Sequence, residues 1–124
     1  MDEFQKMRES IIYQKAPINP TVDTIYELSK QYKQELSVLN EEQQKAVLKS
    51  ILANNYHMVL GTPGSGKTTA IVVLIRILAQ MKQRVLVVSF TNSAIDNVLG
   101  RLKKSGFNNF IRVTNNIASA DEYI

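Results

Sequence analysis

The residue types that can do chemistry gather in a glycine-rich segment near the middle of the chain. Gly61-Thr-Pro-Gly-Ser-Gly-Lys-Thr68 places a glycine, four residues and then Gly-Lys-Thr, the spacing of the Walker A phosphate-binding loop. Glycines let the backbone turn its amide hydrogens onto a phosphate, and a helix that begins at Lys67 points the positive end of its dipole at the same anion. The alternative is a glycine-rich turn that only joins a strand to a helix. An apolar segment before the loop and a long helical pattern after it favour the phosphate site.

Three residues at the end of this loop have distinct expected roles. We predict that Lys67 reaches the β- and γ-phosphates of ATP, that the Thr68 hydroxyl is a ligand of magnesium, and that Thr69 adds a further hydroxyl and amide. The loop residues of the predicted ATP site are Gly61, Thr62, Pro63, Gly64, Ser65, Gly66, Lys67, Thr68 and Thr69.

Helices and strands on both sides must position this loop. The spacing of apolar residues alternates between the pattern of a helix and that of a strand. Apolar residues at helical spacing predict helices, and short apolar runs predict strands. We expect helices at residues 3–15, 21–36, 40–53, 67–81 and 92–104, and strands at residues 56–60, 84–90 and 110–113. From Tyr56 onward the order is strand, helix, strand, helix, strand, which is typical of a parallel sheet with crossover helices. The predicted fold class is therefore α/β, with two or three helices before the sheet.

The composition limits the class of protein. The chain has 124 residues, enough for one small domain or part of a larger one, and 44% of them are apolar. It has no cysteine, which excludes a disulfide framework and cysteine-based metal sites. The N-terminus lacks the apolar core of a secretory signal, and the longest apolar run, Ala70–Ala79, is broken by Arg76. We expect a soluble intracellular protein with no membrane partner.

Positive charge is concentrated in residues 80–113, where six basic side chains stand against one aspartate, a net charge of +5. An excess of this size can hold phosphates. A solvated basic surface is the alternative, and charge by itself favours that alternative.

Two segments that flank the loop narrow the class of protein. Upstream lies Leu39-Asn-Glu-Glu-Gln43, and downstream Val85-Leu-Val-Val-Ser-Phe-Thr-Asn-Ser-Ala-Ile-Asp-Asn97 places a polar turn after the second predicted strand. Together with the loop they resemble the first RecA-like domain of superfamily 1 helicases. The similarity is greatest to the eukaryotic replication helicase–nuclease branch, which is related to the nonsense-decay RNA helicase group. The resemblance covers residues 39–113 and implies a partial RecA-like P-loop NTPase domain.

The resemblance assigns Gln43 to the position of the Q-motif glutamine, whose amide can pair with the adenine edge and so prefer ATP. Asn40-x-x-Gln43 is also a capping box, which would close the start of a helix without any ligand. Both roles can coexist.

The resemblance also implies that the polar turn contacts the backbone of a nucleic-acid strand. The predicted contact residues are Ser89, Thr91, Asn92 and Asn97. Small hydroxyls and amides suit phosphate contact that ignores sequence. The alternative is that Asn92 or Ser93 only caps the following helix, with Asp96 favouring its dipole.

No catalytic residue is predicted within this chain. The family places an acidic Walker B pair on a later strand, and Asp121-Glu122 follows a segment that is a poor strand, so we interpret that match as coincidence. The family's sheet also places other strands between the loop strand and the second predicted strand. We therefore expect this chain alone to fold poorly and neither to hydrolyse ATP nor to unwind a duplex.

The predicted organisation is a helical segment at residues 1–38, a partial RecA-like P-loop NTPase domain at 39–113 and an irregular tail at 114–124. The predicted function is the ATP-binding part of an ATP-dependent DNA helicase, truncated before its Walker B motif. ATP and magnesium are the expected cofactors, and single-stranded DNA is the expected partner, with RNA as the alternative. The rest of the motor would come from missing sequence. The resemblance implies the nucleus, with the cytoplasm as the alternative. The rival functions are another P-loop ATPase or kinase, and a non-catalytic nucleotide-binding fragment.

Overall fold

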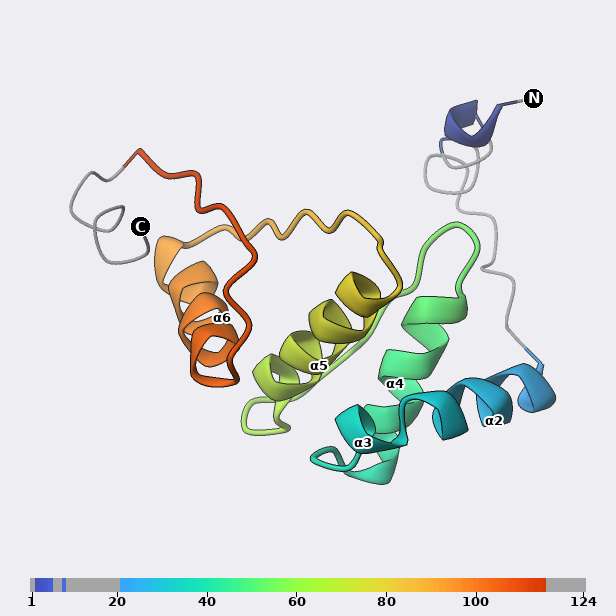
Figure 1. The fold of residues 1–124 in the computed structure, drawn as a ribbon. Helices are drawn as coiled ribbons and strands as arrows, with labels where there is room; N and C mark the ends of the chain where they lie inside the picture. Colours follow the sequence, from blue (N-terminus) through green and yellow to red (C-terminus); the bar gives the residue numbers. More distant parts are fainter. Residues whose placement is uncertain (1, 6–7, 9–20, 116–124) are drawn as a thin grey trace. The chain divides into compact units, whose positions relative to one another are not determined.

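The computed structural model describes residues 2–5, 8 and 21–115 and divides the chain into two compact units (Figure 1). The first unit is Met1–Val85 and the second is Leu86–Ile124. The predicted helix at residues 3–15 lies mostly outside the described residues, as do the predicted tail beyond residue 115 and the Asp121-Glu122 pair. The predicted boundaries at residues 38 and 113 stay predictions.

From residue 21 onward the first unit has two consecutive helices in place of the single helix predicted at residues 21–36. Helix α2 is Val22–Gln31 and helix α3 is Lys33–Leu36, and they are separated at Tyr32. The Thr21 side chain caps α2 by accepting a hydrogen bond from the Thr24 amide, as the sequence predicts. Tyr32 breaks the helix because its backbone leaves the helical region, and its buried side chain joins the core.

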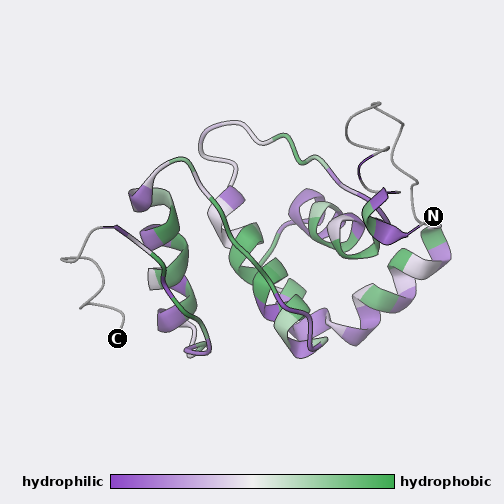
Figure 2. Ribbon diagram, turned by 90° about the horizontal axis from the view of Figure 1, so that it is seen from above, coloured by the Kyte–Doolittle hydropathy of each residue, from purple (hydrophilic) through white to green (hydrophobic). Residues whose placement is uncertain are grey.

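Two longer helices complete the first unit. Helix α4, Glu41–Leu52, starts at an Asn40 cap, and helix α5, Lys67–Gln80, starts at Gly66. Both begin where the sequence predicts. Helix α5 is apolar around most of its circumference (Figure 2). The Gln80 side-chain amide donates to Glu35 Oε1 at 2.8 Å, which joins α5 to α3 and lowers the pKa of that carboxyl.

The core of the first unit lies among these four helices. Its most buried member, Ile77, has no exposed surface. Each Å² of apolar surface removed from water contributes about 25 cal/mol to the free energy of folding. This cluster is therefore the main stabilising feature of the unit. The buried cluster comprises Tyr32, Leu36, Leu39, Val47, Leu48, Val73 and Ile77.

The second unit is built on helix α6, Asn92–Lys104, whose bounds agree with the prediction. The Thr91 hydroxyl caps the helix by accepting from the Ala94 amide at 3.3 Å. At the other end Gly106 has φ +83°, and Phe107 donates its amide to the Leu102 carbonyl at 3.0 Å. This ending turns the chain back, so the following segment runs beside α6 (Figure 1).

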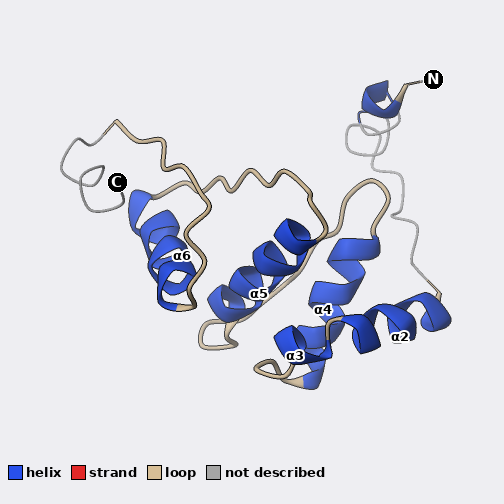
Figure 3. Ribbon diagram, in the orientation of Figure 1, coloured by secondary structure: helices blue, strands red, loops and turns tan. Residues whose placement is uncertain are grey.

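The predicted parallel sheet is wrong: the described residues contain helices, turns and extended segments, and no strand (Figure 3). The segments at residues 56–60, 84–90 and 110–113 run without strand pairing. Their apolar side chains are largely exposed, among them Leu60 at 99%, Leu86 at 87% and Ile111 at 91%. The α/β assignment, with its partial RecA-like sheet, is therefore corrected to a helical arrangement in the described part of the chain.

The physical reason for this difference lies in what a strand requires. Apolar and β-branched residues favour an extended backbone with buried faces, but a strand exists only where a neighbour accepts and donates its backbone hydrogen bonds. None of the three extended segments pairs with another among the described residues. The sequence has the local preference for strands, but the described part of the chain contains no partner strand.

None of the helices in the described residues is long and apolar enough to cross a membrane.

Candidate functional site

The glycine-rich loop lies directly before α5, with its glycines at the positions that need them. Gly64 has φ +78° and Gly66 has φ +77°, a region that disfavours residues with a Cβ atom. Between them, the Ser65 amide donates to the Thr62 carbonyl at 3.2 Å across Pro63 and Gly64. Proline second and glycine third is the pattern of a type II turn. The sequence therefore fixes a tight turn that delivers the chain to the start of α5.

Lys67 folds back over the start of the loop. Its Nζ donates to the Gly61 carbonyl at 2.7 Å, although the residue as a whole is exposed. A Cβ atom at Gly61 would overlap the Lys67 side chain, so the glycine is required by close approach of the lysine stem. The ammonium is thus held within the loop by one neutral carbonyl, an acceptor that a phosphate oxygen can outcompete.

The Ser65 hydroxyl is a second polar group inside the loop. Its Oγ is buried and has no hydrogen-bond partner within the described residues. A buried hydroxyl without a partner costs free energy, which an incoming acceptor would recover. The loop therefore offers a donor and an ammonium close together, and this combination fits a phosphate group.

The positive end of the α5 helix dipole lies at the start of this helix, and no side chain of its first turn neutralises it. The cap residue is Gly66, which has no side chain to accept from the first-turn amides, and no acidic residue lies in that turn. By contrast, α4 begins with Glu41 and Glu42. Because helix N-termini attract anions, α5 presents its favourable end toward the loop. Thr68, at the second position of the helix, supplies the hydroxyl oxygen that suits a magnesium ion bound with the phosphates.

Gln43 connects the start of α4 to the loop. Its side-chain Oε1 accepts a hydrogen bond from the Asn40 backbone N–H at 3.0 Å. Its backbone N–H donates to Asn40 Oδ1 at 2.9 Å, which completes the capping box. Its Nε2 donates to the Ser65 carbonyl at 2.7 Å. The predicted cap is therefore confirmed, and the sequence did not indicate the bond to the loop.

The Gln43 amide still has capacity for a nucleobase. An amide oxygen has two lone pairs and an amide nitrogen has two hydrogens. The helix cap uses one lone pair and the Ser65 carbonyl uses one hydrogen, while the Gly66 carbonyl lies at a marginal 3.5 Å. One acceptor site remains, and the second N–H is held only by the long bond to Gly66, so the amide can offer the donor and acceptor that an adenine edge requires.

The four residues predicted to contact nucleic acid are all exposed: Ser89, Thr91 and Asn92 lie at the start of α6 in the second unit, and Asn97 lies in its second turn. Thr91 caps the helix, so the alternative that Asn92 or Ser93 is the cap is wrong. Ser89 Oγ accepts from the Thr91 amide at 3.4 Å, and Asn97 Oδ1 accepts from Arg101 Nε at 3.5 Å. These weak local bonds leave the hydroxyls and amides at the surface.

Arg112 is a site residue that sequence reasoning missed. It was counted only as part of the basic excess, yet its side chain is 8% exposed and its guanidinium lies against Asn92 and Asp96 at the start of α6. Its partners Asn92 and Asp96 lie twenty and sixteen residues before it, so no local sequence signal indicated this role.

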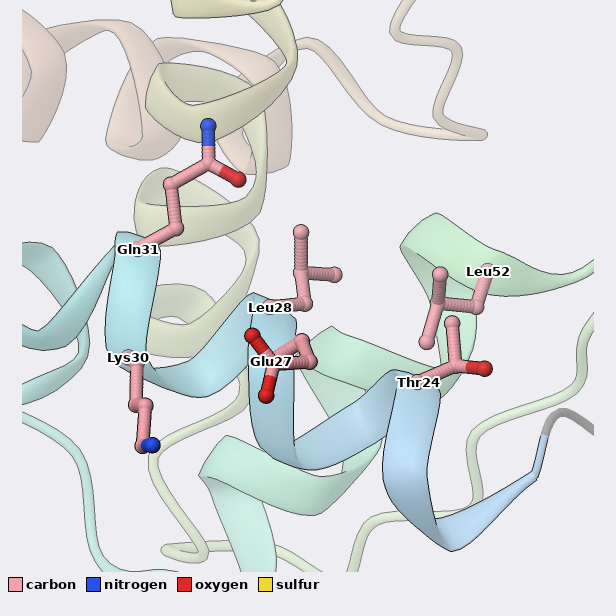
Figure 4. A pocket seen from close by; sticks show the side chains of 6 residues that line it. All are labelled: Thr24, Glu27, Leu28, Lys30, Gln31 and Leu52. Atoms are coloured by element: carbon pink, nitrogen blue, oxygen red, sulfur yellow. The ribbon is translucent and has the colours of Figure 1, made fainter.

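A shallow depression of about 470 Å³ lies between α2 and α4, away from the loop (Figure 4). It is open to solvent and has both charged and apolar walls. None of the predicted site residues lines it. The lining residues are Thr24, Glu27, Leu28, Lys30, Gln31 and Leu52.

Comparison with known proteins agrees with the resemblance inferred from the sequence. Residues 38–122 match the family described as "AAA domain". The chain is similar to the DNA replication ATP-dependent helicase/nucleases of Schizosaccharomyces pombe, with 48% identity over 68 residues, and of Homo sapiens, with 45% identity over 69 residues. It is also similar to that of Arabidopsis thaliana, with 39% identity over 84 residues. The inferred resemblance to replication helicase–nucleases is confirmed.

These matches cover 55%, 56% and 68% of this chain, respectively, but only 5 to 6% of the length of each relative. No solved structure matches the chain.

Proposed function

This chain belongs to the AAA domain family, and from that premise we propose that it is the ATP-binding part of a nucleic-acid-dependent helicase motor. The observation that carries the proposal is the loop at Gly61–Thr69. It combines a glycine turn, an ammonium at the Gly61 carbonyl, a buried hydroxyl without a partner and the positive end of α5. The relatives' names, which state ATP dependence and a role in DNA replication, support the same function.

In this proposal each residue of the loop has one task. Lys67 leaves the Gly61 carbonyl and pairs with the β- and γ-phosphates, while the Ser65 hydroxyl donates to a phosphate oxygen. Thr68 supplies one oxygen ligand to magnesium, which when bound neutralises phosphate charge. Gln43 keeps its bonds to Asn40 and Ser65 and uses its remaining donor and acceptor for adenine. Ser89, Thr91, Asn92 and Asn97 contact the phosphates of single-stranded DNA in the nucleus.

The proposal is tested by titrating a fluorescent ATP analogue against the 124-residue chain, with magnesium and with a chelator. We expect saturable binding that unlabelled ATP displaces and that magnesium strengthens, because Thr68 would hold the metal and the metal would neutralise phosphate charge. In Thr68→Ala the affinities with and without magnesium should converge. A labelled oligothymidylate tests the nucleic-acid half separately. A chain that binds neither probe would contradict the proposal, and binding of nucleotide alone would favour another P-loop ATPase.

The two roles of Gln43 are separated by Gln43→Ala. We expect the free energy of unfolding to fall by about 1–2 kcal/mol, because one bond of the capping box and the bond to the Ser65 carbonyl are lost. Binding of both ATP and GTP should weaken because the loop loses its connection to α4. If Gln43 recognises adenine, the affinity for ATP should fall more than the affinity for GTP. Both affinities are measured by displacement of the fluorescent ATP analogue.

Gln44→Ala is the matched control for this substitution. The Gln44 amide donates to the carbonyls of Leu36 and Leu39, both at 3.0 Å, and has no bond to the loop. Its removal should lower stability to a similar extent and leave nucleotide affinity unchanged. If both variants lose the same nucleotide affinity, Gln43 acts through stability alone.

A further inference from the structure

Arg112 bridges two segments of the second unit that are twenty residues apart. Its Nη2 donates to Asn92 Oδ1 at 3.1 Å and lies 3.1 Å from Asp96 Oδ1. Its Nη1 donates to the Val113 carbonyl at 3.3 Å. The side chain is 8% exposed, and Nε has no acceptor among the described residues. A buried guanidinium held at several points is stiff, so it fixes whatever it touches.

The fold explains how Arg112 reaches the start of α6. The helix ends at Lys104, and the turn at Gly106 sends the chain back along the helix (Figure 1). By residue 112 it has returned to the first turns of α6, next to the predicted nucleic-acid contacts. The basic residues Arg101, Lys103 and Lys104 lie in the last turn, at the opposite end of the helix. Arg112 therefore contacts the predicted interface at Asn92, while Arg101 contacts it one turn further along, at Asn97.

The bond to Asn92 determines which group of that amide faces solvent. Asn92 is exposed, and its oxygen is occupied by the guanidinium. Its NH₂ group is left available at this exposed position, and two N–H donors suit phosphate oxygens. A free asparagine would present oxygen or nitrogen equally, and the oxygen would repel a phosphate.

The contact with Asp96 has a second effect at the same place. The carboxylate is 29% exposed and lies in the first turns of α6, where it would repel a phosphate that approaches Thr91 or Asn92. At 3.1 Å the guanidinium compensates this charge.

We propose that Arg112 is a positioning residue for nucleic-acid phosphates: it holds the Asn92 amide with its donors outward and neutralises Asp96, without itself contacting the ligand. This inference rests on the proposed nucleic-acid binding of Ser89, Thr91, Asn92 and Asn97. Burial of Arg112 supports the indirect role, because a nucleic-acid strand bound at the surface cannot reach its Nε.

The test is the affinity of the 124-residue chain for a fluorescent oligothymidylate, measured by anisotropy at several salt concentrations. We expect Arg112→Gln to weaken binding about fivefold or more, as for loss of a charge-assisted contact. The slope of log affinity against log salt should stay unchanged, because no phosphate contact of the arginine is lost. An arginine that touches phosphate would lower that slope by about one. Lys104→Gln, on an exposed basic residue, is the control for loss of charge alone.

A double-mutant cycle distinguishes positioning from general stability. Asn92→Ala removes the outward donors at an exposed site, so the fold should survive. In that background Arg112→Gln should cost clearly less affinity than in the wild type, because one of its two effects is already gone. Additive losses, a slope reduced by one, or equal binding of Arg112→Gln and wild type would each overturn the inference. If the wild type fails to bind the oligonucleotide, the proposed nucleic-acid function is refuted as well.

Discussion

Lys67→Ala is expected to weaken ATP binding by roughly ten- to a hundredfold. Charge-assisted hydrogen bonds contribute about 1.5–3 kcal/mol each, and each 1.4 kcal/mol is a factor of ten in affinity. The loss is greater than a surface charge would give because the ammonium is already held in the loop, 2.7 Å from the Gly61 carbonyl. It needs only to exchange that carbonyl for a phosphate, so little ordering of the side chain opposes binding.

The measurement is a titration of a fluorescent ATP analogue against wild type, Lys67→Ala and the control Lys49→Ala. Lys49 lies on α4, is exposed and has no part in the loop. The control should bind as wild type does. The thermal melting of Lys67→Ala should shift little, because only one exposed hydrogen bond is lost. Equal affinities of wild type and Lys67→Ala would mean that the loop is not the nucleotide site.

Gly66→Ala is expected to lower the free energy of unfolding by about 2–3 kcal/mol and to weaken nucleotide binding by about tenfold or more. Gly66 has φ +77°, and a residue with a Cβ atom pays about 1–2 kcal/mol in that region. The new Cβ would also overlap Gln43 Nε2, which would break the bond to the Ser65 carbonyl. Loss of that bond adds about 1 kcal/mol.

Gly64→Ala is a close control for this effect. Gly64 has nearly the same φ, +78°, but a Cβ there would have nothing within 4 Å. Gly64→Ala should therefore lower the free energy of unfolding only by the cost of a left-handed backbone at a residue with a Cβ atom. A second comparison uses Gln43→Ala, which removes the overlapping amide. In that background Gly66→Ala should cost about as much as Gly64→Ala, as chemical denaturation would show. Equal costs of the two glycine substitutions in the wild-type background would contradict the role of the Gln43 contact.

Features encoded by neighbouring residues could be predicted from the sequence. The helix at Asn92–Lys104 has the predicted bounds, and the caps at Thr21 and Asn40 are where the side-chain pattern places them. The tight turn in the glycine-rich loop was predictable for the same reason, because its glycine spacing encodes that turn. These features depend on contacts within a few residues, which a single sequence contains in full.

Features that depend on distant partners could not be predicted. Val85–Val88 has the composition of a buried strand, yet Leu86 and Val88 are 87% and 79% exposed because no strand among the described residues covers them. Composition expresses a preference for burial and does not supply the partner. The same limit explains Gln43 and Arg112. Their bonds to Ser65 and to Asn92 span 22 and 20 residues, and no local pattern encodes them.

The bond between Gln43 and Ser65 links the conformation of the glycine-rich loop to fraying of the first turn of α4. The first turn of a helix opens and closes continually, and each opening of α4 at Asn40 would release the side chain that holds the loop. Local opening and ligand affinity are then linked, since a ligand that binds only the closed loop lowers the population of the open turn. Amide hydrogen exchange of Gln43, whose N–H is bonded to Asn40 Oδ1, would consequently report on nucleotide at a site that the phosphates do not touch. We therefore expect opening of this one helix cap to loosen the glycine-rich loop as well.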